Sequence, residues 1–199
     1  MNNLFIGDYL PVLEVFYKKI PCVFAIIEKK NINSPVFIFC KNNNIPLEII
    51  ETTMDLKNFI HEKYFNNVIV ASFGLILPYF FLDKCKRVFN FHPGDVYTNR
   101  GRHPLPNAIK RLDSKIAISV HEIDSEKIDK GRLFAQYFIA LDRESSYECN
   151  YSRLLKILSF LTEELCLHLS LDREIPLWNW SPEKNSYLER VKRRELESL

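Results

Sequence analysis

Short apolar runs that alternate with helical segments limit the folds open to this chain more than any other feature. The runs Cys22–Ile27 and Val68–Ser72 indicate parallel strands that are covered on both faces. Further strands are predicted at Leu4–Ile6, Leu47–Ile50 and Val88–Phe91. The predicted helices are Tyr9–Lys18 with Asp8 as a candidate cap, a helix from Ser34-Pro35 toward Lys41, Leu56–Tyr64, and one that begins at Pro106–Leu112. This alternation predicts an α/β fold with an open, mostly parallel twisted sheet and helices on both faces.

The second half of the chain changes character. Alternating strands are predicted at Ile116–Ile123 and Leu133–Leu141, on either side of a turn at Asp129, and Tyr151–Leu169 has the spacing of an amphipathic helix. We therefore expect one domain over residues 1–170 and a C-terminal extension over 171–199.

The extension is first aromatic and then basic. Trp178 and Trp180 suit packing on the core or burial in an oligomer contact, and the sequence does not separate these alternatives. The run Arg190–Arg194 is typical of a solvated helix end, and contact with a substrate phosphate is the other interpretation left open.

Composition narrows the class of protein. The chain has 199 residues, 47% of them hydrophobic, which is enough for one substantial core. Its net charge of +2 argues against a nucleic-acid binder with a broad basic surface. Residues Met1–Asn3 lack the positive charge of a signal peptide, and no apolar run approaches the roughly 20 residues of a membrane span. We expect a cytoplasmic protein without a membrane partner.

Cysteine and histidine spacing gives no sign of a metal site. The five cysteines are scattered without Cys-x-x-Cys spacing, which indicates reduced thiols. The histidines outside the segment discussed next form no ligand pattern such as His-x-x-x-His, so no metal is expected.

One segment places groups suited to acyl transfer side by side. The strand Val88–Phe91 runs into Asn90-x-His92 and is stopped by Pro93-Gly94, so Asn90 and His92 should project from the same side of a strand end. An imidazole carries protons near neutral pH, and an amide can donate a hydrogen bond to a developing oxyanion. A carboxylate such as that of Asp129 can orient or charge the imidazole.

These residues belong to an ordered set of motifs that resembles the folate-dependent formyltransferase family. The family motifs Asn-x-His-Pro, Arg-Gly and Asp-x-Gly match Asn90–Pro93, Arg100-Gly101 and Asp129–Gly131, and its Ile-Leu-Pro segment matches Ile76–Pro78. The resemblance runs from about Leu4 to Gln136. It implies the Rossmann-like formyltransferase fold for residues 1–170, with 10-formyltetrahydrofolate as the co-substrate.

The resemblance also implies the site residues. Asn90, His92 and Asp129 would be catalytic. The folate would lie against Gly74, Leu75, Ile76, Leu77 and Asp124, and the loop after His92 offers Tyr97, Arg100, Gly101 and Arg102 as substrate contacts. Arg100 or Arg102 could pair with a pyrophosphate, while a surface charge is the other interpretation.

Departures from the family limit what the resemblance implies about the substrate. The family usually has Ser-Leu-Leu-Pro after His-Pro, whereas this chain has Gly94–Thr98. Phe5–Tyr9 holds one glycine, so the phosphate loop of a glycinamide ribonucleotide transformylase is missing. A methionyl-tRNA formyltransferase would need a further C-terminal domain, for which this sequence leaves no room.

We therefore expect an N-formyltransferase acting on a nucleotide-linked amino sugar, as in lipopolysaccharide or O-antigen biosynthesis, with no nucleic-acid partner and a homodimer left open. The alternatives are a formyltetrahydrofolate hydrolase-like enzyme, a glycinamide ribonucleotide transformylase-like enzyme and an inactive folate- or nucleotide-binding module.

Overall fold

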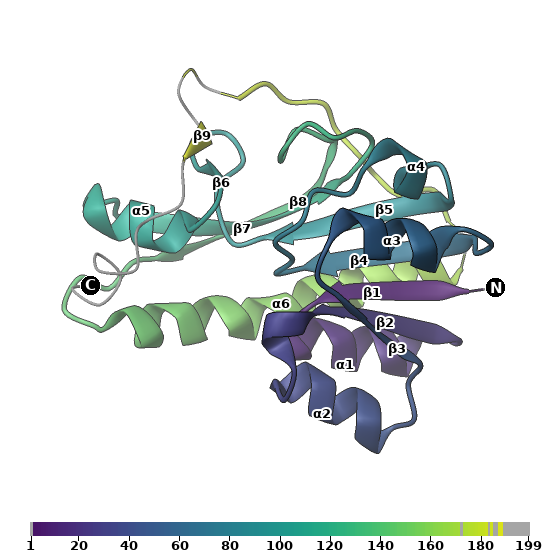
Figure 1. The fold of residues 1–199 in the computed structure, drawn as a ribbon. Coiled ribbons are helices and arrows are strands. Elements are labelled where there is room, and N and C mark those ends of the chain that lie inside the picture. Colours follow the sequence, from purple (N-terminus) through teal and green to yellow (C-terminus); the bar gives the residue numbers. More distant parts are fainter. Residues whose placement is uncertain (1, 172, 183, 185–186, 189–199) are drawn as a thin grey trace.

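The fold is built on one seven-stranded sheet. The computed structural model describes residues 2–171, 173–182, 184 and 187–188 (Figure 1). The strand order is β3-β2-β1-β4-β5-β7-β8, and β6 pairs separately with β9. Neighbouring strands from β3 to β5 are parallel, whereas β7 and β8 are antiparallel to their neighbours. The mostly parallel sheet predicted from the sequence is confirmed.

The strands and helices alternate along most of the chain. The strands are β1 (Asn3–Gly7), β2 (Val23–Glu28), β3 (Leu47–Ile50), β4 (Phe65–Ala71), β5 (Cys85–His92), β6 (Arg100–Gly101), β7 (Lys115–Glu122), β8 (Leu133–Ala140) and β9 (Tyr187–Leu188). The helices are α1 (Leu10–Lys19), the 3-10 turn η1 (Lys29–Asn31), α2 (Pro35–Asn42), α3 (Thr53–Ile60), α4 (Tyr79–Leu82), α5 (Pro104–Lys110) and α6 (Tyr147–Ser170).

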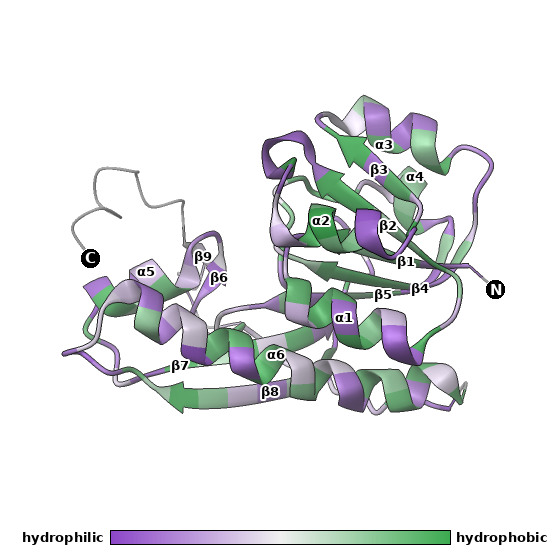
Figure 2. Ribbon diagram, turned by 90° about the horizontal axis from the view of Figure 1, so that it is seen from below, coloured by the Kyte–Doolittle hydropathy of each residue, from purple (hydrophilic) through white to green (hydrophobic). Residues whose placement is uncertain are grey.

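Helices cover both faces of the sheet because its central strands are apolar on both sides. Along β1, Phe5 packs in the core that includes α1, α2 and α6, whereas Leu4 and Ile6 pack in a second core with α3 and α4. Successive side chains of a strand point to opposite faces, so one strand serves both cores. Figure 2 shows the central strands of this sheet as apolar, whereas polar residues are frequent on the helices and loops.

Side-chain caps set where several helices begin. Ser34 caps α2 as predicted, because its Oγ accepts a hydrogen bond from the Phe37 amide. The prediction of Asp8 as the cap of α1 is wrong. The cap position is Tyr9, and Asp8 instead accepts a hydrogen bond from the Ser34 hydroxyl at 2.5 Å.

Several predicted helix bounds also need correction. Helix α1 spans Leu10–Lys19 rather than Tyr9–Lys18, and α5 begins at Pro104 rather than Pro106. Helix α3 ends at Ile60 rather than Tyr64, and it begins at Thr53 rather than Leu56 because Thr52 and Asp55 form a reciprocal capping box. Helix α6 begins at Tyr147 rather than Tyr151, since Ser146 accepts a hydrogen bond from the Cys149 amide. The short helix α4 was not predicted.

Some predictions fall outside the described residues. The basic run Arg190–Arg194 is among them, so a solvated helix end and a contact with substrate phosphate both remain predictions. In the part of the chain that the structure describes, no helix is both long and apolar enough to span a membrane.

Candidate active site

A cavity of about 580 Å³ lies at the carboxyl ends of the parallel strands. Tyr9 follows β1, Ser72 follows β4 and His92 ends β5, and all three line it. From β1 the chain continues to β2 and β3 on one side of β1, and then returns to place β4 on the other side. Ligands of open α/β sheets bind at such a reversal of strand order.

Strand pairing brings three polar side chains to one face of the sheet. Asn90 and His92 lie two residues apart on β5 and share a face, as the sequence predicts. Asn90 is directly opposite His121 of the antiparallel strand β7, so these two side chains also share that face.

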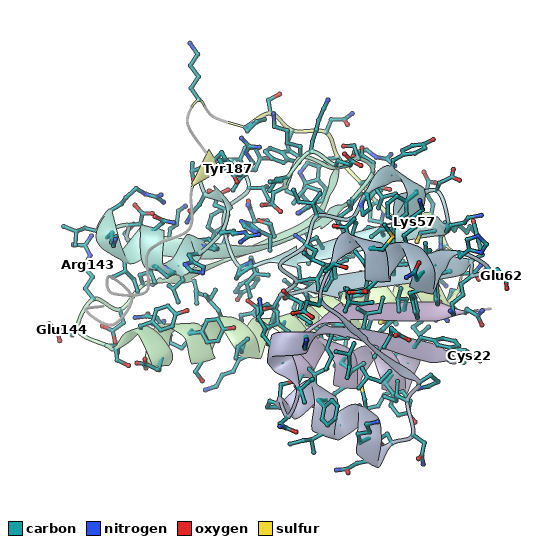
Figure 3. All side chains as sticks on the ribbon, viewed as in Figure 1. Cys22, Lys57, Glu62, Arg143, Glu144 and Tyr187 are labelled. Atoms are coloured by element: carbon teal, nitrogen blue, oxygen red, sulfur yellow. The ribbon has the colours of Figure 1, made fainter. Side chains whose placement is uncertain are left out.

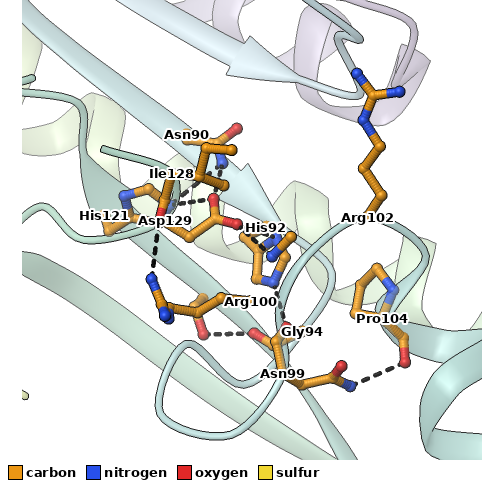
Figure 4. A network of polar contacts seen from close by, with 12 residues as sticks. Asn90, His92, Gly94, Asn99, Arg100, Arg102, Pro104, His121, Ile128 and Asp129 are labelled. Carbon is orange, nitrogen blue, oxygen red and sulfur yellow. Dashed lines mark hydrogen bonds and ion pairs between the residues drawn. The ribbon is translucent and has the colours of Figure 1, made fainter. Parts of the chain in front are cut away.

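The carboxylate of Asp129 joins this group from the turn before β8 (Figure 4). Its Oδ1 lies 3.2 Å from both Asn90 Nδ2 and His121 Nε2, and its Oδ2 accepts a hydrogen bond from the Gly101 amide at 2.8 Å. Nδ1 of His92 lies 3.5 Å from Oδ2. Asp129 is 9% exposed and has φ +47°, a left-handed conformation that Asp adopts more readily than most residues.

The net effect of these contacts is to lower the pKa of Asp129. Burial raises the pKa, because it disfavours the charged form. The charge of His92, the hydrogen bond and charge of His121, and the Gly101 amide together outweigh burial. Asp129 is therefore ionised at neutral pH, as an acceptor of several hydrogen bonds must be.

The partners of each histidine define which ring nitrogens carry protons. Nε2 of His92 lies 2.8 Å from the Asn99 carbonyl oxygen, which can only accept, so this nitrogen donates. His121 Nδ1 likewise donates to the Glu122 carbonyl at 2.7 Å. Its Nε2 lies 3.2 Å from both Asn90 Nδ2 and Asp129 Oδ1, and because an ionised carboxylate can only accept, a proton on Nε2 is donated to Asp129. His92 thus points Nδ1, its other nitrogen, toward Asp129 and the cavity.

Gly94 leaves the space that the His92 ring needs. A Cβ atom at this position would lie 2.5 Å from His92 Nε2 and 2.7 Å from the Asn99 carbonyl oxygen. This close packing explains why residue 94 is a glycine, whereas the formyltransferase motif usually has serine at this position.

Gly94→Ala is therefore expected to displace His92 or the Asn99 loop. We expect a stability loss of about 1–3 kcal/mol, typical of overpacking, together with weaker activity. Thermal unfolding and steady-state kinetics of the variant measure both effects. Unchanged stability and activity would show that the loop adapts without moving His92.

The residues predicted to contact folate mostly line the cavity. Gly74, Leu75, Ile76 and Leu77 do so, whereas Asp124 does not and accepts a hydrogen bond from its neighbour Ser125. Both backbone polar groups of Gly74 are hydrogen-bonded to side chains. Its amide donates to Glu28 Oε2 at 2.9 Å, and its carbonyl accepts from Arg102 Nη2 at 2.7 Å.

The residues predicted to contact the substrate divide into two pairs. Gly101 and Arg102 line the cavity. Arg100 is buried and donates to the Ile128 carbonyl at 3.2 Å, and the ring of Tyr97 packs against Trp180. Neither Arg100 nor Tyr97 lines the cavity, so their contact with substrate stays a prediction without geometric support.

Sequence reasoning missed His121 and an aromatic wall. His121 and Ser119 are two residues apart in a strand whose other interior residues are apolar, which was a usable signal, but the pairing of His121 with Asn90 depends on the strand register. Tyr147 and Tyr151 stack on α6 with ring centroids 5.8 Å apart, and Tyr9 meets Tyr151 edge-on at 6.3 Å. These tyrosines line the cavity.

Comparison with known proteins identifies the family. The model of the formyl transferase family matches residues 21–159, which include Asn90, His92 and Asp129. The chain belongs to this family.

Relatives in the family include enzymes with different acceptors. The methionyl-tRNA formyltransferase of Pelagibacter ubique is 28% identical over 158 residues, which cover 73% of this chain and 51% of that protein. The chain thus spans about half the length of this curated relative.

Among solved structures, the N-formyltransferase of Helicobacter canadensis, in complex with folinic acid and dTDP-3-aminofucose, superposes with a TM-score of 0.74 at 17% identity. That match covers 98% of this chain and 72% of the other. The phosphoribosylglycinamide formyltransferase of Bacillus halodurans has a TM-score of 0.74 at 19% identity, covering 86% of this chain and 96% of its own. At these identities the likeness establishes the fold.

Proposed function

We propose that the protein transfers a formyl group from 10-formyltetrahydrofolate to a primary amine, with Asn90, His92 and Asp129 as the catalytic residues. The observation that carries the proposal is the meeting of an amide, an imidazole and an ionised carboxylate at the wall of one cavity. We assign this chemistry to residues 1–170 and treat 171–199 as a C-terminal extension.

The cavity suits a flat heterocycle such as the pterin of folate. Its volume of about 580 Å³ lies in the usual range for small-molecule sites. Val70, Leu77 and Ile123 are among the apolar residues that line the cavity. Backbone groups of Leu75–Leu77 add hydrogen-bonding partners for ring nitrogens and oxygens. When bound, the co-substrate supplies the formyl group.

The catalytic residues stabilise charge and move protons. His92 Nδ1 faces the cavity, and when the ring carries a proton on both nitrogens Nδ1 can donate to the formyl oxygen as negative charge develops there. Asn90 Nδ2 donates to Asp129 at 3.2 Å, a long contact that can be exchanged for one to the same oxygen. The amine nitrogen bonds to the formyl carbon, the bond from that carbon to the folate nitrogen breaks, and a proton passes from the amine to that nitrogen. Asp129 keeps His92 oriented and helps to move this proton, directly or through water.

The finer proposal is that the acceptor is the amine of a nucleotide-linked amino sugar. Tyr9, Tyr147 and Tyr151 offer aromatic surface for a sugar or base, and Lys30 and Arg102 offer positive charge for phosphate. Burial, followed by the charge and hydrogen bond of Tyr151, raises the pKa of Tyr9, so its hydroxyl stays neutral. The Helicobacter canadensis structure contains dTDP-3-aminofucose, which supports this class of acceptor. A role in lipopolysaccharide or O-antigen biosynthesis stays a prediction.

Methionyl-tRNA is the second candidate acceptor. The curated relatives that match this chain include methionyl-tRNA formyltransferases of Pelagibacter ubique and other organisms. Because the matched region covers only about half of the Pelagibacter ubique enzyme, the length of the chain does not exclude methionyl-tRNA, and a nucleic acid remains a candidate partner.

A panel of acceptors separates these candidates. The protein is incubated with 10-formyltetrahydrofolate and, in parallel, amino-sugar nucleotides, glycinamide ribonucleotide, methionyl-tRNA or no amine. Loss of free amine and the mass of the product are measured. Formylation of an amino-sugar nucleotide supports the finer proposal, whereas formylation of another acceptor replaces it. Formate release that needs no amine would establish a hydrolase instead, and folate binding without either reaction would indicate an inactive binding module.

Reduced folate is expected to slow hydrogen exchange in two segments of the cavity wall. These are Leu75–Leu77 and the turn Ser125–Ile128, whose backbones should contact the pterin. Hydrogen exchange with and without 5-formyltetrahydrofolate measures the protection. Protection confined to the region of Trp178 would contradict this placement of the folate.

A further inference from the structure

The segment that follows α6 contacts two loops that hold candidate site residues. These are the turn at Asp129 and the loop between His92 and Gly101. Figure 1 shows the segment returning from the end of α6 toward β6, coloured yellow-green. Trp178 exchanges two backbone hydrogen bonds of 3.0 Å with Leu133, the first residue of β8. Farther on, β9 pairs with β6, where Tyr187 is opposite Arg100 and Leu188 is opposite Gly101. Figure 3 shows Tyr187 at this point above β6.

Trp180 makes the contacts that join the two loops. Its indole Nε1 donates a hydrogen bond of 2.8 Å to the carbonyl of Gly131, two residues after Asp129. Its ring lies 5.1 Å from that of Tyr97, which belongs to the loop between His92 and Gly101. One partly buried side chain therefore contacts the Asp129 turn on one side and the loop after His92 on the other.

A displacement of Gly131 should move Asp129, because the turn that contains both residues is tightly packed. A Cβ at Gly131 would lie 1.9 Å from the Glu122 carbonyl oxygen, so the turn presses directly on the end of β7. Asp129 itself is in the left-handed region, at φ +47°. A movement of the Gly131 peptide should therefore shift the carboxylate of Asp129 relative to the Gly101 amide, which it now meets at 2.8 Å.

We propose that Trp180 is a positioning residue that holds the Asp129 turn against the loop carrying Gly101. Its indole N–H fixes the Gly131 carbonyl, and its ring fixes Tyr97. Together these contacts keep the carboxylate of Asp129 aligned with His92. The catalytic consequence rests on the proposed function, whereas the mechanical tie does not.

Trp180→Phe tests the role because it removes the indole donor and keeps an aromatic ring. Trp178→Phe is the matched control, since Trp178 is 44% exposed and binds Leu133 through its backbone. The direct reporter is hydrogen exchange at the Gly101 amide, which donates to Asp129. We expect this exchange to speed up about fivefold to tenfold in Trp180→Phe, the order expected for one lost neutral hydrogen bond, and to stay unchanged in the control.

Kinetics separate positioning from simple loss of folded protein. In Trp180→Phe we expect kcat per folded enzyme to fall about tenfold, with KM for folate changed by less than roughly twofold. We also expect the pH dependence of kcat to differ from that of the wild type, because the substitution changes the alignment of Asp129 with His92. A fall that only follows the folded fraction, with an unchanged pH profile, would contradict positioning.

The outcomes also separate this proposal from the proposed function. Unchanged exchange at Gly101 in Trp180→Phe overturns the positioning role, whatever the activity. Faster exchange in a protein that formylates no amine supports the mechanical tie and rejects the function. If Trp180→Phe does not fold, Tyr97→Leu breaks the other contact of the same indole ring. Faster Gly101 exchange in Tyr97→Leu supports the proposal, and unchanged exchange contradicts it.

Discussion

Replacing His92 by Asn, or Asn90 by Ala, is expected to lower kcat by about two to three orders of magnitude, the usual effect of losing one oxyanion donor. Folate KM should change much less, because neither side chain belongs to the Leu75–Leu77 wall. Steady-state kinetics on the acceptor found by the panel measure both values. His92→Asn also removes the contact to Asn99, so the folded state of the variant is checked by thermal unfolding.

Controls for these variants come from α3 and the residue after it. His61 and Asn58 are exposed, and His61→Asn and Asn58→Ala make the same chemical changes away from the cavity. Both controls should keep normal turnover. Near-normal turnover in His92→Asn or Asn90→Ala would show that the assigned site is wrong.

Asp129→Asn is expected to lower turnover by at least tenfold to about a hundredfold, because the charge that orients His92 is lost. If Asp129 only shaped its turn, this change would hardly affect stability, since Asn suits a turn about as well as Asp. The structure gives a different expectation. The carboxylate accepts from Gly101, Asn90 and His121, and an Asn side chain must turn an N–H₂ group toward some of these donors. A stability loss of about 1–3 kcal/mol is expected.

The pH dependence of this stability loss gives a further check. The pKa of Asp129 in the folded protein is below its ordinary value of 3.8, so the unfolded chain takes up the proton first as pH falls. The stability from ionised Asp129 is complete above about pH 5 and is lost as pH falls through the lowered pKa. The stability difference between wild type and Asp129→Asn should therefore be largest near neutral pH and narrow below about pH 4. Denaturant unfolding across this range measures it. Equal stability at neutral pH together with unchanged turnover would leave Asp129 only a turn residue.

The parts of the fold that depend on local pattern could be predicted from the sequence. Apolar runs such as Cys22–Ile27 gave the parallel strands, and the two-residue period of a strand placed Asn90 and His92 on one face. Family motifs supplied Asp129, whose distance from Asn90 in the sequence hides their contact at 3.2 Å.

The rest depends on contacts between segments far apart in the chain. Asp8 has the sequence position of a helix cap, but its carboxylate accepts a hydrogen bond from Ser34, at the start of another helix. His121 reaches Asn90 only through the register of β5 and β7. Trp180 reaches Gly131 only because the segment after α6 folds back across the sheet. No local propensity encodes such pairings, since they are set by packing of the whole domain.

A single-turnover experiment tests the central proposal most directly. Enzyme in excess over labelled 10-formyltetrahydrofolate is mixed with the acceptor from the panel, and the label is followed in the amine product and in free formate. We expect the label to pass to the amine in the wild type and to do so about a hundredfold more slowly in His92→Asn at saturating folate. Label that appears only as formate, or an equal rate of amine formylation in His92→Asn, would contradict formyl transfer by this site.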